Sequence, residues 1–184
     1  MAKKMDNLLL SRDDAALCVI DMQEKLLPVI HNKDKIINNT VRLIRFAKII
    51  GLPILLTEQE KLGATVPEIM AEIPNPDPMK KFEFSAVRCS GFIERVKQLH
   101  RKSLILTGIE THICIAQTAL QLLPHYTVHV ISDAVSSRSP DDWNIGLQRM
   151  RRSGVVISST EMVIFELLEK AGTDEFKAVL PLVK

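Results

Sequence analysis

Cysteine is scarce in this chain, and no two cysteines form a CxxC pair. Cys18, Cys89 and Cys114 are odd in number and far apart. A disulfide framework or a zinc site is built from paired or closely spaced cysteines. The pattern instead indicates free thiols in a reducing compartment, and we expect a cytoplasmic protein.

The sequence also lacks long apolar runs and an excess of one charge. No stretch approaches the roughly 18 uninterrupted apolar residues of a membrane-spanning helix, and the short run Leu8 to Leu10 is soon followed by charges. We expect neither a signal peptide nor a membrane anchor. Lys and Arg number 24 against 22 Asp and Glu, a net charge of +2. Because these charges are scattered, binding to nucleic acid or to an acidic membrane has little support.

The chain does contain a regular alternation of strand-like and helix-like segments. Its 184 residues, 46% of them hydrophobic, suffice for one core, so we expect one domain over 1–184. Parallel strands need crossover helices, and the alternation therefore predicts a single-domain α/β/α sandwich with a mostly parallel sheet. Residues 173–184 follow this core as a C-terminal arm that we expect to support a homo-oligomer. The expected strands are 15–20, 53–56, 79–84, 103–107, 127–131 and 155–158, and the expected helices are 33–50, 91–100, 111–123, 140–152 and 160–170.

Reactive side chains follow several of these strands, at the edge where parallel sheets bind ligands. Asp21 ends the first strand and is a candidate base, the alternative being a helix cap. Cys114 lies in the first turn of an expected helix, where the dipole stabilises a thiolate; the alternative is a small buried apolar residue. Lys80 and Lys81 lie in the segment of the weakest expected strand, 79–84. A lysine there would favour the thiolate, although a lysine pair in a loop is usually solvated.

Three motifs, VIDMQ, KFEFSA and GIETHICIAQTA, resemble the isochorismatase-like hydrolases in sequence and order. The resemblance covers residues 15–170 and implies the Rossmann-like fold of that superfamily. There, a strand-ending Asp, a Lys four residues before the Ser of an FSA-like motif and the Cys of GxxTxxC form the catalytic triad. The resemblance thus implies a triad of Asp21, Lys81 and Cys114, because the spacing to Ser85 selects Lys81 over its neighbour.

The resemblance also has implications for the oxyanion site and for metals. It implies a cis peptide bond between Ile109 and Glu110, with the N–H groups of Glu110 and Cys114 as oxyanion donors; the alternative is an ordinary trans turn. Metal-binding nicotinamidases carry histidines after the second strand, whereas TEQEKLGA has none. We therefore expect no metal and no cofactor. The segments TEQ, LGATVPEI and SSRS are similar to the isochorismatase domain-containing subgroup.

The activity that these features indicate is hydrolysis of a small carbonyl compound through a Cys114 thioester. Amide hydrolysis is favoured, with vinyl-ether or ester hydrolysis, or a non-catalytic binding or scaffold role, as alternatives. Gln59 and Arg138 follow the second and fifth strands and are candidate substrate contacts, although a structural salt bridge is the alternative for Arg138. The physiological substrate does not follow from the sequence.

The same assignments rank the three thiols by reactivity. Cys18 lies in an expected buried strand, and Cys89 lacks the combination of acid, lysine and helix terminus. Because reactivity follows thiolate fraction and access, Cys114 is predicted to be the only strongly reactive thiol.

Overall fold

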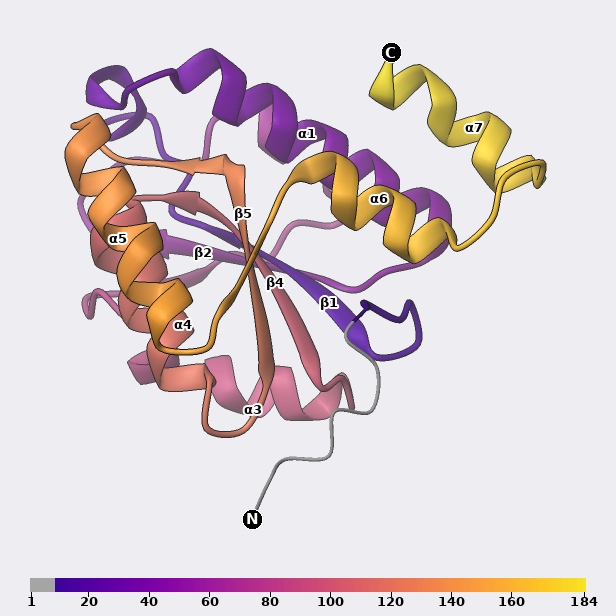
Figure 1. The fold of residues 1–184 in the computed structure, drawn as a ribbon. Coiled ribbons are helices and arrows are strands. Elements are labelled where there is room, and N and C mark those ends of the chain that lie inside the picture. Colours follow the sequence, from indigo (N-terminus) through magenta and orange to yellow (C-terminus); the bar gives the residue numbers. More distant parts are fainter. Residues whose placement is uncertain (1–8) are drawn as a thin grey trace.

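A computed structural model describes residues 9–184, which form one six-stranded sheet with helices on both faces (Figure 1). The strand order is β3-β2-β1-β4-β5-β6, and every neighbouring pair is parallel. The strands are β1 (Ala15–Ile20), β2 (Ile54–Gln59), β3 (Met79–Lys81), β4 (Ser103–Ile109), β5 (Thr127–Ser136) and β6 (Val156–Ser158). The helices are α1 (Lys33–Ile50), α2 (Pro67–Met70), α3 (Phe92–Gln98), α4 (Ala116–Leu122), α5 (Pro140–Arg152), α6 (Thr160–Leu168) and α7 (Asp174–Val183), with short turns η1 (Leu27–Val29), η2 (Ala86–Arg88) and η3 (Thr111–Ile115).

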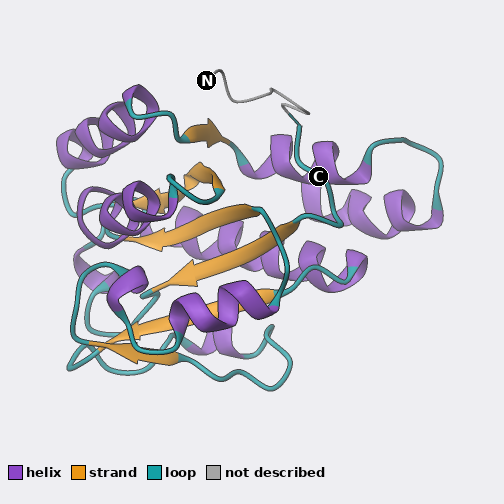
Figure 2. Ribbon diagram, turned by 90° about the horizontal axis from the view of Figure 1, so that it is seen from below, coloured by secondary structure: helices purple, strands orange, loops and turns teal. Residues whose placement is uncertain are grey.

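The helices form two layers, one on each face of the sheet (Figures 1 and 2). Successive side chains of a strand point to opposite faces. In β1, Leu17 and Val19 join the core beneath α1 and α6, whereas Cys18 and Ile20 join the core beneath α3, α4 and α5. The predicted α/β/α sandwich with a parallel sheet is confirmed. In the described part of the chain, no helix has the length and apolar character needed to cross a membrane.

Several elements differ from the sequence-based expectation. The helix expected at 111–123 begins as one π-helical turn, η3, in which the Glu110 carbonyl accepts from the N–H groups of both Ile113 and Ile115. The C-terminal helix α7 packs against α1 of its own chain, where Val179 is buried. Through this contact the C-terminal segment, residues 173–184, joins the core on this face of the sheet.

Gly108 lies where two central strands approach closely. It pairs with Ile20 across β4 and β1, has a φ of +120°, and a Cβ at this position would overlap with the backbone carbonyl of Ile20. We predict that Gly108→Ala lowers the free energy of unfolding by more than about 4 kcal/mol, because neither backbone can move aside. Gly51→Ala is the control: its φ is +71° but its surroundings are open, so only about 1 kcal/mol is expected. Urea denaturation showing equal losses would contradict this interpretation.

His129 in β5 gives the fold a dependence on pH. Its side chain is buried, and its Nδ1 has no hydrogen-bond partner among the described residues. Burial lowers the pKa of His129 to about 4. Between pH 6.5 and pH 4, this histidine is therefore protonated in the unfolded chain but neutral in the folded chain. The free energy of unfolding decreases as the pH falls through this interval.

We predict that this histidine accounts for a loss of about 3 kcal/mol over that interval, since one pKa unit corresponds to about 1.4 kcal/mol. Urea denaturation of the wild type and of His129→Leu at pH 7 and pH 4 provides the measurement. The loss between pH 7 and pH 4 should be about 3 kcal/mol smaller in His129→Leu than in the wild type. Identical losses would show that the protonation of His129 is not coupled to folding.

Candidate active site

Three strand ends converge on one buried polar cluster. Asp21 follows β1, Lys81 ends β3, and Cys114 lies in η3 just after β4. Lys81 Nζ lies 2.6 Å from Asp21 Oδ2 and 3.8 Å from Cys114 Sγ. The structure thus brings together the three side chains that the sequence nominates, at the edge of the sheet where the strand order reverses.

Asp21 is held as a buried carboxylate with a donor on each oxygen. Oδ1 accepts from the Thr57 hydroxyl at 2.8 Å, and Oδ2 accepts from Lys81. The Asp21 and Lys81 side chains have no exposed surface. The alternative that Asp21 caps the next helix is wrong, because Leu26 and Asn32 occupy the N-cap positions of η1 and α1.

Lys81 is enclosed by oxygen atoms on several sides. Besides Asp21, its ammonium contacts Gln59 Oε1 at 2.7 Å and the carbonyl oxygens of Glu83 and Phe84 at 3.3 Å. The preceding residue, Lys80, is exposed. Because a buried ammonium is tolerated only when it is paired and hydrogen-bonded, this enclosure accounts for a fully buried lysine.

The resting nucleophile candidate is a thiol. Burial and the neighbouring charge of Asp21 raise the pKa of Cys114 to about 12, while Lys81 and a backbone hydrogen bond with Glu110 act in the opposite direction. Desolvation and the adjacent carboxylate thus outweigh the effect of Lys81 on the thiol pKa. Burial likewise raises the pKa of Cys18 to about 12 and raises that of Cys89.

The segment just before Cys114 contains a cis peptide bond and a salt bridge to Arg138. The peptide bond between Ile109 and Glu110 is cis. The Glu110 carboxylate is buried and accepts from both the backbone N–H and Nε of Arg138 at 3.1 Å. Arg138, a candidate substrate contact, therefore forms a salt bridge, although 58% of its side chain remains exposed. Gln59, the other candidate, directs its side-chain amide at Lys81 and at the Phe82 carbonyl instead.

Two polar residues of the site had no role assigned to them from the sequence. Thr57 supplies a hydroxyl to Asp21, and the fully buried Gln23 bonds to the backbone of Gln59. Gln23 stands two residues after Asp21 in the VIDMQ motif, which was the available signal. Within residues 9–184, no group of three or more His, Cys, Asp and Glu side chains is arranged to hold a metal ion.

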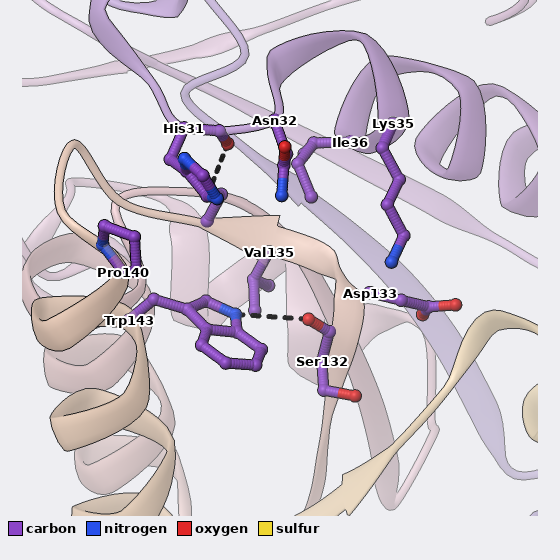
Figure 3. Close-up of a pocket in the computed structure, with 10 residues that line it drawn as sticks. His31, Asn32, Lys35, Ile36, Ser132, Asp133, Val135, Pro140 and Trp143 are labelled. Atoms are coloured by element: carbon purple, nitrogen blue, oxygen red, sulfur yellow. Dashed lines mark hydrogen bonds between the residues drawn. The ribbon is translucent and has the colours of Figure 1, made fainter.

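A separate small pocket lies where β5 extends beyond β6, between the starts of α1 and α5 (Figure 3). Its volume is about 150 Å³, and Trp143 closes one side by donating from Nε1 to the Ser132 carbonyl. His31 and Lys35 line the opposite side. None of the triad side chains lines this pocket, so it is distinct from the candidate active site.

Removing one partner of the buried ion pair is predicted to lower the free energy of unfolding strongly. Lys81→Met would leave the Asp21 carboxylate buried without its cation, and removing one partner of such a pair costs about 3–5 kcal/mol. Combining it with Asp21→Asn should restore most of that loss, because no charge is then left unpaired. Chemical denaturation of the single and double variants measures both effects. A double variant no more stable than Lys81→Met would contradict the charge argument.

Comparisons with known proteins identify the family and the fold. The isochorismatase domain family matches residues 15–162. Isochorismatase domain-containing protein 2A of Mus musculus is 39% identical over 176 residues, which cover 94% of this chain and 84% of that protein. Among solved structures, the MAR1 ribonuclease from Caenorhabditis elegans has a TM-score of 0.89 and 34% identity, covering 95% of this chain and 92% of that one. The YcaC gene product from Escherichia coli, described as an octameric hydrolase of unknown specificity, has a TM-score of 0.89 and 26% identity, covering 96% and 91%.

Proposed function

This chain belongs to the isochorismatase family, and from that premise we propose that it is a cysteine hydrolase that cleaves the C–N bond of a small amide. The observation that carries the proposal is the position of the Lys81 ammonium, in contact with both the Asp21 carboxylate and the Cys114 sulfur. Such a cluster supplies a nucleophile, a base and a fixed positive charge.

In the proposed first step, the Cys114 sulfur attacks the carbonyl carbon while its proton passes to Asp21. Because burial and Asp21 raise the pKa of this thiol to about 12, the resting group is protonated at neutral pH, and we assign the proton transfer to the attack step. The transfer keeps one negative and one positive charge in the cluster. Once Asp21 is neutral it no longer opposes the developing charge, and Lys81 stabilises the sulfur.

The tetrahedral intermediate then collapses to a thioester. We assign the N–H groups of Glu110 and Cys114 as donors to its oxyanion, beside the cis peptide bond. Asp21 returns the proton to the leaving nitrogen as the C–N bond breaks. In the second half, Asp21 accepts a proton from water as the water oxygen attacks the thioester, and that proton reaches the sulfur when the C–S bond breaks.

A panel of small amides, esters and vinyl ethers tests this proposal, with ammonia or amine release as the readout for amides. Wild-type protein should release ammonia from at least one amide, and Cys114→Ala should not. Hydrolysis confined to esters or vinyl ethers would favour those alternatives, and no turnover on any class would favour a binding or scaffold role. RNA belongs in the panel because one structural neighbour is named a ribonuclease; cleavage of RNA by wild type but not by Cys114→Ala would overturn amide hydrolysis.

We extend the proposal to a cytoplasmic homo-oligomer that acts without a metal or cofactor. Support for assembly comes from the octameric Escherichia coli neighbour. Light scattering at micromolar concentration should give a mass above one chain, and a monomer would refute the assembly.

A further inference from the structure

The two charged partners of the site come from strands that are not neighbours. In the order β3-β2-β1, strand β2 separates Lys81 of β3 from Asp21 of β1. The lysine must therefore reach across the end of β2 to meet the carboxylate. The β2 residue paired in register with Lys81 is Gln59, which places this glutamine beside the path of the lysine side chain.

The side-chain amide of Gln59 is fixed at both ends. Its Oε1 accepts from Lys81 Nζ at 2.7 Å, and its Nε2 donates to the carbonyl of Phe82 at 2.7 Å. Turning the amide over would direct its NH₂ group at the ammonium and its oxygen at a carbonyl, so both contacts would become repulsive. The Phe82 contact therefore keeps an acceptor facing Lys81.

The backbone of Gln59 is fixed as well, by Gln23. Gln23 Oε1 accepts from the Gln59 N–H at 2.8 Å, and Gln23 Nε2 donates to the Gln59 carbonyl at 2.9 Å. Gln23 is fully buried, and its own N–H donates to the Asp21 carbonyl. The contacts close a ring that runs through Asp21, Lys81, Gln59 and Gln23.

We propose that Gln59 is a positioning residue that holds the Lys81 ammonium within reach of the Cys114 sulfur, rather than a substrate contact. An ammonium has three N–H groups. Asp21 and Gln59 occupy two directions at 2.6 and 2.7 Å, which leaves the third for the carbonyls of residues 83 and 84 and for Sγ at 3.8 Å. Without Gln59, the carboxylate and the two more distant carbonyls would be the only oxygen partners left for Nζ among these contacts, and no acceptor from β2 would fix its position. This inference rests on the proposed function, since it assigns Lys81 to the chemistry of Cys114.

Alkylation of Cys114 by iodoacetamide, followed residue by residue with peptide mass spectrometry at fixed pH, tests this role without a substrate. Gln59→Met keeps the side-chain length but has no oxygen acceptor, and it should slow the alkylation about tenfold, which corresponds to one pKa unit of the thiol. Gln148→Met, an exposed glutamine of α5, is the matched control and should leave the rate unchanged. Unfolding free energies establish that each variant is folded. If Gln59→Met does not fold, Gln59→Asn, whose amide is one carbon too short to reach Lys81, should show the same slowing.

A second background shows whether Gln59 acts through the lysine. In Lys81→Met/Asp21→Asn, which leaves no unpaired buried charge, adding Gln59→Met should change the alkylation rate by less than about twofold. With a hydrolysed amide, Gln59→Met should lower kcat while KM stays nearly constant. An unchanged alkylation rate in folded Gln59→Met, or the same tenfold effect in the background without Lys81, would overturn the proposal. Absence of amide hydrolysis in the wild type would contradict the proposed function but leave this test intact.

Discussion

Asp21→Asn is expected to slow amide hydrolysis about 10³-fold while making Cys114 easier to alkylate. General acid–base catalysis by one side chain contributes about 10²–10⁴-fold, and the amide of Asn cannot accept the thiol proton. Burial is the largest cause of the raised pKa of the Cys114 thiol, and the charge of Asp21 is the second. Removing that charge while Lys81 remains therefore lowers the thiol pKa.

The two readouts of this variant move in opposite directions, which separates a base from a merely structural residue. Turnover is measured with the best amide of the panel, and alkylation with iodoacetamide at the same pH. Asp34→Asn, an exposed substitution on α1, is the control and should alter neither rate. If turnover and alkylation fell together in folded Asp21→Asn, Asp21 would be acting through the fold and not as a base.

Cys114→Ala is expected to reduce hydrolysis to the uncatalysed background, a loss of at least about 10³-fold, because no other nucleophile takes its place in the proposed reaction. The substitution removes one sulfur atom from a buried position, so the fold should be retained. Cys89→Ala is the matched control, since this thiol is also buried and its hydrogen bonds go to the backbone carbonyls of Lys80 and Ser90. It should retain turnover within about threefold. Comparable activity of Cys114→Ala and wild type would remove Cys114 from the mechanism.

The fold could be predicted from the sequence where local signals mark both ends of an element. The run Ala15–Ile20 is uniformly apolar and ends at Asp21, and it forms β1 with those bounds. Gly51 adopts the left-handed conformation that ends α1, and the Ser139 hydroxyl accepts from the N–H of Asp141 at the start of α5. Such signals act within one turn of the chain, so a single sequence reveals them.

The parts that could not be predicted depend on contacts between distant segments. The sequence pattern of residues 111–123 is that of an ordinary helix. Its first turn is nevertheless π-helical, because the N–H groups of Ile113 and Ile115 both donate to the Glu110 carbonyl. The raised pKa of Cys114 follows from burial and from Asp21, 93 positions earlier in the chain. Gln59 is a candidate substrate contact by sequence because it follows an expected strand, and its hydrogen bonds to Lys81 of β3 and to Gln23 in the loop after β1 appear only in the structure. Motifs identify the reactive groups, whereas the polar ring that holds them requires the strand order.

During turnover, Cys114 is expected to become covalently acylated. Mass spectrometry of the intact protein, quenched in acid while a slow amide substrate is being hydrolysed, tests this most directly. We expect a mass increase equal to the acyl group, mapped by peptide analysis to Cys114, transient in the wild type and absent from Cys114→Ala. Steady amide hydrolysis with no adduct on Cys114, at a quench time well within the turnover period, and with equal rates in wild type and Cys114→Ala, would contradict it.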